Sequence, residues 1–304
     1  RDVDVDVANL LQQAIPAAAE IESPYIRAAR YARISALLRL LGDIPSSRRQ
    51  EDRCLEILQE NTSTILEVRE LEAVSVIVSH FRRRGLVEQA LEVADLIPLD
   101  SWRALELARI AGAAYELERA ALSREIADQA VELIRQIRGR PPEVLTAQAL
   151  LARIYRNLGE ARRGEQLAAR VVSSLTGAPA TPAFKLPFVE FLVYRVESGD
   201  VGSLQEVVER SESADFRARL LLDLADRPEL AADERLQAGV LRQAAGEELR
   251  ELSREVQLSL LTSFVRRGLL NEARRLIDET SDSYVNAAGF IAIIGAFPEY
   301  TGEG

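Results

Sequence analysis

The residue types that most often carry enzyme or metal chemistry are scarce in this sequence. It contains one histidine, His80, and one cysteine, Cys54. His80 could belong to a catalytic triad, but the sequence contains no Gly-x-Ser-x-Gly nucleophile motif. One histidine and one cysteine are also too few for the usual zinc sites. Because no phosphate loop or dinucleotide fingerprint occurs either, the sequence favours a non-enzymatic protein without metal or cofactor.

Carboxylates are plentiful, and they offer the remaining route to catalysis. Glu247, Glu248, Glu251 and Glu255 follow one another at helical spacing, with arginines between them. This pattern is typical of a solvated helix face stabilised by ion pairs. Catalytic carboxylates have no clear linear signature, so an enzyme built on such helices stays open as a minor alternative.

Arginines gather just before three glycines of the chain. They are Arg82, Arg83 and Arg84 before Gly85, Arg153 and Arg156 before Gly159, and Arg266 and Arg267 before Gly268. One interpretation is electrostatic, because cations at a helix C-terminus face the negative end of the helix dipole. The other is functional, because the guanidinium fork suits carboxylates and phosphates.

Composition and charge narrow the class of partner. The chain has 304 residues, 47% of them hydrophobic, and a formal net charge of −10. Duplex DNA and anionic membranes both require a basic footprint, so neither is expected as a partner. Recognition of RNA by a helical repeat is a weak alternative for the same reason. No apolar stretch approaches the roughly 18 residues of a membrane span, and the compartment, cytoplasmic or extracytoplasmic, stays open.

The elements that must position these residues are helices. Apolar residues recur at three and four positions nearly everywhere, and strand patterns are almost absent, which predicts an all-α chain. Glycines, prolines and helix-capping residues separate the apolar runs and indicate about sixteen helices of roughly 10–20 residues. Five glycines close apolar runs and are expected to adopt a left-handed conformation there. They are Gly42, Gly85, Gly159, Gly199 and Gly268.

A short pattern repeats along the chain. An aromatic residue is followed four positions later by glycine, and a small residue comes five positions after that glycine. The three copies are Phe81–Gly85–Ala90, Tyr155–Gly159–Gly164 and Phe264–Gly268–Ala273. The glycine intervals correspond to a period of about 34–43 residues. We expect the aromatic residue to pack between the paired helices and the small residue to allow close helix approach.

This pattern resembles the tetratricopeptide repeat, although unit lengths vary and the proline that closes each family unit is mostly missing. The resemblance implies a right-handed superhelix of about eight helical hairpins, in which each hairpin covers the apolar face of the next. We expect one continuous solenoid over residues 1–304. The loop at 176–182 is a candidate hinge that separates residues 1–175 from 183–304.

The resemblance also implies a concave groove lined by the first helix of each pair. Residues at fixed distances before each terminal glycine would then face a bound peptide. In this chain they include Ser79, Arg82 and Arg83; Arg153, Arg156 and Asn157; Val189, Val193 and Val196; and Arg266. The polar and basic positions would hold an acidic segment, and the three valines would accept apolar side chains. The family's Lys/Asn carboxylate clamp is absent apart from Asn157, which argues against chaperone tails as ligands.

Two functional classes follow from these observations. The first is a non-enzymatic scaffold that binds an acidic or amphipathic segment of another protein in its groove. The second is a structural or regulatory segment of a larger assembly, which self-associates into a homo-oligomer or serves as a sensor region.

Overall fold

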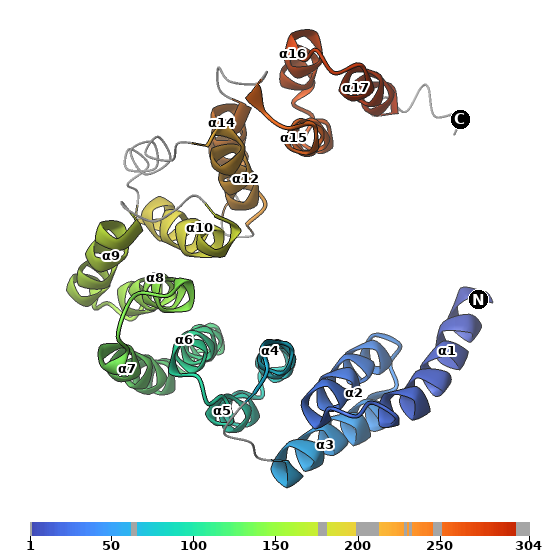
Figure 1. Ribbon diagram of the computed structural model, residues 1–304, viewed down its shortest axis with the longest axis vertical. Coiled ribbons are helices and arrows are strands. Elements are labelled where there is room, and N and C mark those ends of the chain that lie inside the picture. The colour runs from blue at the N-terminus through green and yellow to red at the C-terminus, as the bar shows by residue number, and fades with distance from the viewer. Residues whose placement is uncertain are drawn as a thin grey trace. The chain divides into compact units, whose positions relative to one another are not determined.

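In its described residues, the computed structural model consists of helices and the turns between them (Figure 1). It describes residues 2–61, 66–175, 181–198, 213–227, 230, 233–245 and 251–295. These residues contain fifteen helices and no strand. The all-α class predicted from the sequence is therefore confirmed. The chain divides into two compact units, Arg1–Ala168 and Ala169–Gly304.

The first unit is a series of antiparallel hairpins preceded by one further helix. Its helices are α1 (Asp2–Ala19), α2 (Pro24–Leu40), α3 (Ile44–Glu60), α4 (Val68–Arg83), α5 (Val87–Asp95), α6 (Asp100–Glu116), α7 (Ala120–Gln136), α8 (Pro142–Asn157) and the first part of α9 (Ala161–Leu175). Helices α2 and α3, α4 and α5, and α6 and α7 pair as hairpins. Each hairpin joins the next through its first helix, because α4 packs on α2 and α6 packs on both α4 and α8.

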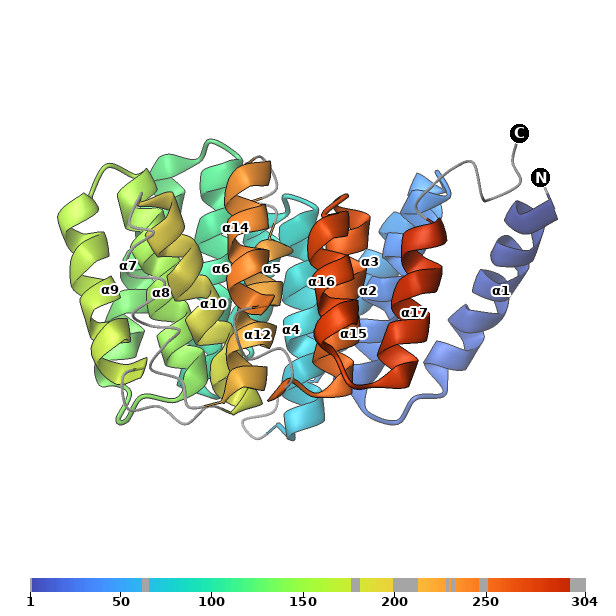
Figure 2. The ribbon, with the colours of Figure 1, turned by 90° about the horizontal axis from the view of Figure 1, so that it is seen from above.

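This arrangement gives the first unit two layers. We call α2, α4, α6 and α8 the first-helix layer, and α3, α5, α7 and α9 the second-helix layer. Figure 2 shows the helices within the unit standing side by side. Each hairpin covers part of the next one, so the hydrophobic core runs continuously through the unit. This is the organisation of a tetratricopeptide-like helical repeat.

The second unit repeats the scheme. It contains the end of α9 and, in the described residues, α10 (Pro182–Glu197), α12 (Ala214–Ala225), α14 (Glu234–Ala245), α15 (Arg254–Arg266), α16 (Leu270–Glu279) and α17 (Ser283–Gly295). Helices α12 and α14 form one pair and α15 and α16 another, while α17 packs on both α15 and α16. The boundary between the two units falls within α9. Most of the candidate hinge, residues 176–180, lies outside the described residues, so the hinge stays a prediction.

Glycines end the first helices as expected. The backbone φ angle is +83° at Gly42, +71° at Gly85, +82° at Gly159 and +70° at Gly268. An L-residue with a side chain rarely adopts this conformation, so glycine stops each helix and starts the turn into its partner. The fifth predicted terminator, Gly199, lies outside the described residues.

The small residue of the repeated pattern marks a close approach of two helices. A Cβ atom placed on Gly164 would lie 2.7 Å from the carbonyl oxygen of Ala152, which is backbone and cannot move aside. The aromatic residues of the pattern, Phe81, Tyr155 and Phe264, are fully buried. The close approach is therefore confirmed at Gly164, and the burial of the three aromatic residues agrees with the expected packing between helices.

Ion pairs connect successive hairpins at the repeat distance. Arg124 Nε lies 2.6 Å from Glu160 Oε1, and Arg219 Nη2 lies 2.8 Å from Glu255 Oε2. The partners are 36 residues apart in both pairs, which matches the period read from the glycines. Exposed pairs of this kind are weak, because water and salt screen the attraction between the charges. They add little to stability, but they show that equivalent positions in neighbouring hairpins lie together.

Candidate functional site

The polar residues predicted for the groove lie on two helices of the first-helix layer. Ser79, Arg82 and Arg83 occupy the C-terminal half of α4, and Arg153, Arg156 and Asn157 occupy that of α8. All of them are partly or fully exposed. Helix α6 packs between α4 and α8, so its own residues separate the two groups. The described geometry thus places them in one layer but not in one cluster.

Helix α6 contributes two residues that the sequence analysis missed. Arg109 Nη1 donates a hydrogen bond of 2.6 Å to Glu106 Oε1. The Glu106 side chain is only 1% exposed. Its other oxygen, Oε2, is buried and has no hydrogen-bond partner in the described part of the chain. A buried carboxylate oxygen without a partner is rare, because it loses water without regaining a hydrogen bond.

Arg82 of α4 lies in the electrostatic field of this pair. Burial lowers the pKa of the Arg82 guanidinium below its usual value, and the positive charge of Arg109 lowers it further. Glu106 opposes this shift but contributes less than Arg109 does. The Arg82 side chain makes no ion pair with any described residue, and its buried Nε has no hydrogen-bond partner. Arg83 also lowers the Arg82 pKa and Glu116 raises it, so three guanidinium groups are opposed by two carboxylates, which leaves positive charge at the α4–α6 junction.

We call Arg82, Glu106 and Arg109 the α4–α6 cluster. Arginine forks bind carboxylates through charge-assisted hydrogen bonds, so the cluster can accept an additional acidic group. The sequence signal for it was weak. Glu106 and Arg109 are three residues apart on a helix, which is also the spacing of an ordinary surface ion pair.

The three valines predicted to accept apolar side chains lie on α10. Val189 is 3% exposed and Val193 is fully buried, so these two belong to the hydrophobic core. The assignment of Val189 and Val193 to a binding surface needs correction for this reason, and we do not retain them as site residues. Val196 is partly exposed. Arg266 is exposed and lies in the second unit, beside a surface cavity.

The single histidine lies in a buried polar cluster rather than in an accessible site. Glu51 Oε1 accepts hydrogen bonds from Ser35 Oγ at 3.0 Å and from Arg84, and it lies 3.1 Å from His80 Nε2. The side chains of Glu51 and His80 are each 8% exposed. Ser47 extends the cluster, its Oγ lying 2.9 Å from Ser35 Oγ. We call this group the Glu51 cluster; it ties α2, α3 and α4 together.

Burial also determines the chemistry of the neighbouring ionisable groups. It lowers the pKa of His80 below its usual value, although Glu51 partly opposes the shift. It raises the pKa of the Cys54 thiol to about 12, assisted by the negative charge of Glu51. Cys54 is therefore a protonated core residue, not a reactive thiol.

The described residues hold no group of three or more histidine, cysteine, aspartate or glutamate side chains placed to bind a metal ion. Among the same residues, no helix is long and apolar enough to cross a membrane.

Comparison with known proteins gives only distant structural similarity. No family model matches the chain, and no curated protein matches it. The solved structure of Ton1535 from Thermococcus onnurineus NA1 is 12% identical, with a TM-score of 0.33, and the match covers 96% of this chain and 99% of that one. A putative kinesin light chain from Podosopora anserina with nearly identical TPR-like repeats is 16% identical, with a TM-score of 0.40. That match covers 68% of this chain and 100% of the other. The tetratricopeptide-like character of the fold follows from its own hairpins, glycine turns and repeat-spaced contacts.

Proposed function

We propose that the protein is a non-enzymatic scaffold that binds an acidic segment of a partner protein on the first-helix layer of its first unit. The α4–α6 cluster would hold the acidic group. Arg83 of α4, together with Arg153, Arg156 and Asn157 of α8, would extend the contact along the partner segment.

The observation that carries this proposal is the excess positive charge at the α4–α6 cluster. Arg82 is partly buried without an ion pair among the described residues, and the charges that act on it are those of two arginines, Arg83 and Arg109, and two glutamates, Glu106 and Glu116. A carboxylate of the partner would neutralise this charge at the exposed parts of Arg82 and Arg109. A fold stabilised by its own contacts alone gains nothing from this arrangement, whereas a recognition site does.

The test is capture of partners from a native extract, followed by affinity measurement with the captured partner. Arg82→Glu/Arg109→Glu is expected to weaken binding at least tenfold, because it reverses the charge that attracts the partner. The matched control is Arg135→Glu/Arg162→Glu, which changes net charge equally but lies on α7 and α9 of the second-helix layer. Glu106→Gln should strengthen binding, because it removes the carboxylate that competes for Arg109. Equal losses in the two charge-reversal variants would disprove the proposed face, and so would the absence of any partner.

A second candidate function is self-association through the last described helix. Helix α17 contains no charged residue, and Tyr284, Phe290 and Ile291 are 61%, 53% and 72% exposed. An exposed apolar face of this kind is typical of an interaction surface. Light scattering of the wild type and of Phe290→Ser/Ile291→Ser separates the two functions. A mass above that of the monomer, lost in the variant, would support assembly through α17.

A further inference from the structure

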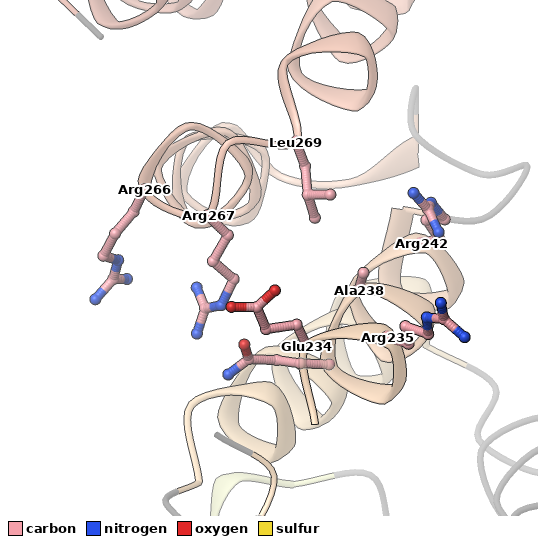
Figure 3. A pocket seen from close by; sticks show the side chains of 8 residues that line it. Glu234, Arg235, Ala238, Arg242, Arg266, Arg267 and Leu269 are labelled. Atoms are coloured by element: carbon pink, nitrogen blue, oxygen red, sulfur yellow. The ribbon is translucent and has the colours of Figure 1, made fainter. Parts of the chain in front are cut away.

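The second unit contains a surface cavity of about 730 Å³ beside the start of α14 and the turn that follows α15 (Figure 3). It lies at the end of the hairpins, where α12 turns toward α14 and α15 turns into α16. The described residues that line it all belong to the second unit, so it shares no residue with the first-helix layer of the first unit. Its size is in the range of about 300–1,000 Å³ that is typical of ligand-binding sites.

Four arginines border this cavity, and two of them are already paired. Arg267 forms an ion pair with Asp226, and Arg242 Nε lies 2.6 Å from Glu272 Oε1. The side chains of Arg235 and Arg266 make no ion pair or hydrogen bond with any residue that the structure describes. Both are exposed, so their charges are available to a ligand.

The basic residues lie on opposite sides of the cavity. Figure 3 shows Arg266 on one side, Arg235 and Arg242 on the other, and Glu234 beside Arg267 between them. A compact anion such as phosphate would need guanidinium groups that converge on one point. It would also meet the carboxylate of Glu234 at the centre. This geometry instead suits an extended ligand whose negative charges lie at its two ends.

The middle of the cavity has a different character. Beside Glu234 and Arg267, Ala238 and Leu269 provide an apolar wall between the two basic sides. Across the cavity, a basic side is followed by an apolar wall and then by a second basic side. An extended peptide with an apolar side chain between acidic ones is complementary to this order. The positive charge is local to the surroundings of the cavity, because residues 177–304 as a whole carry 14 basic and 22 acidic side chains. The basic rim therefore stands out against an acidic background.

We propose that this cavity binds an extended acidic peptide segment, in which an apolar residue lies between acidic residues. Arg266 on one side and Arg235 on the other pair with the flanking carboxylates, and the apolar side chain packs on Leu269 and Ala238. This site is independent of the face proposed above, and the experiment separates the two.

The experiment is a fluorescence anisotropy titration of the full chain with a labelled peptide, acetyl-Glu-Glu-Leu-Glu-Glu-amide. All proteins carry Arg82→Glu/Arg109→Glu, so that the proposed site of the first unit does not contribute. Adding Arg235→Glu/Arg266→Glu is expected to weaken binding at least tenfold. Adding Arg274→Glu/Arg275→Glu, a charge-matched pair on the exposed side of α16, should change the affinity by less than twofold. Far-ultraviolet circular dichroism confirms that each variant is folded.

Two further arms define the ligand chemistry. Replacing the peptide's leucine by serine should weaken binding severalfold, because the apolar wall then loses its partner. Inorganic phosphate should compete no better than chloride at equal ionic strength. The proposal is overturned if the background protein fails to bind the peptide, if both charge-reversal pairs weaken binding equally, or if phosphate displaces the peptide specifically.

Discussion

Two buried glutamates of the first unit lie in similar surroundings and differ in how completely they are satisfied. Glu51, at the junction of α2, α3 and α4, contacts Ser35, His80 and Arg84 through one oxygen. Glu106, at the α4–α6 junction, has a single partner, Arg109, and an oxygen without any among the described residues. Both side chains are less than a tenth exposed. Such burial is tolerated only when the charge is compensated.

The difference separates a contact that is complete within the fold from the contact that we propose binds a partner. In the Glu51 cluster the hydrogen bonds of three helices end on one carboxylate, so every member depends on the others. In the α4–α6 cluster Glu106 is hydrogen-bonded to Arg109 alone among the described residues, and Arg82 lies in the electrostatic field of both. The first arrangement is complete within the fold, whereas the second leaves positive charge that, in our proposal, an acidic group of the partner neutralises.

The largest expected effect follows from breaking the structural cluster. Glu51→Ala leaves Arg84 and His80 without their shared acceptor and should lower the free energy of unfolding by about 3 kcal/mol. Chemical denaturation of the full chain measures it. Glu56→Ala is the matched control, since Glu56 is exposed on the same helix and should change stability by less than about 0.5 kcal/mol. Similar losses of unfolding free energy in both variants would show that the Glu51 cluster stabilises the fold no more than an exposed glutamate does.

The comparison is sharpened by two arginines at the end of one helix. Arg84→Ala removes a charged donor from Glu51 and should cost about 2 kcal/mol. Arg82→Ala should change stability by less than about 0.5 kcal/mol, because burial and Arg109 already disfavour the Arg82 cation. Its effect should appear in partner binding instead. Denaturation curves and partner affinities of the two variants test this division. It fails if Arg82→Ala proves the more destabilising change.

The sequence was sufficient for the parts of the fold that depend on local spacing. Gly85, Gly159 and Gly268 end their helices because the turn requires a left-handed residue, and Gly164 is small because α9 crosses Ala152 at backbone contact. These requirements act over a few residues. The pattern that expresses them is therefore visible without the structure.

The binding surfaces depend on which side of a helix meets its neighbours, and this was harder to predict. Helix α10 has apolar residues on every side, so its pattern did not show which valines would be buried. In the structure α10 packs on α12, and the rings of Phe188 and Phe216 meet edge to face with their centroids 5.7 Å apart. Val189 and Val193 are buried. The roles of Glu51 and Glu106 could not be predicted either. The sequence of a helix does not show how many hydrogen-bond donors will surround an acidic residue in the folded protein.

The smallest expected effect is a dependence of stability on pH that belongs to the Glu51 cluster alone. The pKa of His80 is lowered in the folded state, mainly by burial, so the unfolded chain binds its proton more readily. Stability should therefore fall as the pH drops from 7 through the ordinary histidine value, and it should recover on return to neutral pH. His80 is the only histidine, so His80→Gln should remove the slope between pH 7 and about 5.5. Arg82→Gln should leave that slope intact, because the α4–α6 cluster contains no histidine. Denaturation at a series of pH values measures both. An unchanged slope in His80→Gln, or its loss in Arg82→Gln, would mean that the two junctions are not electrostatically distinct in the way the structure indicates.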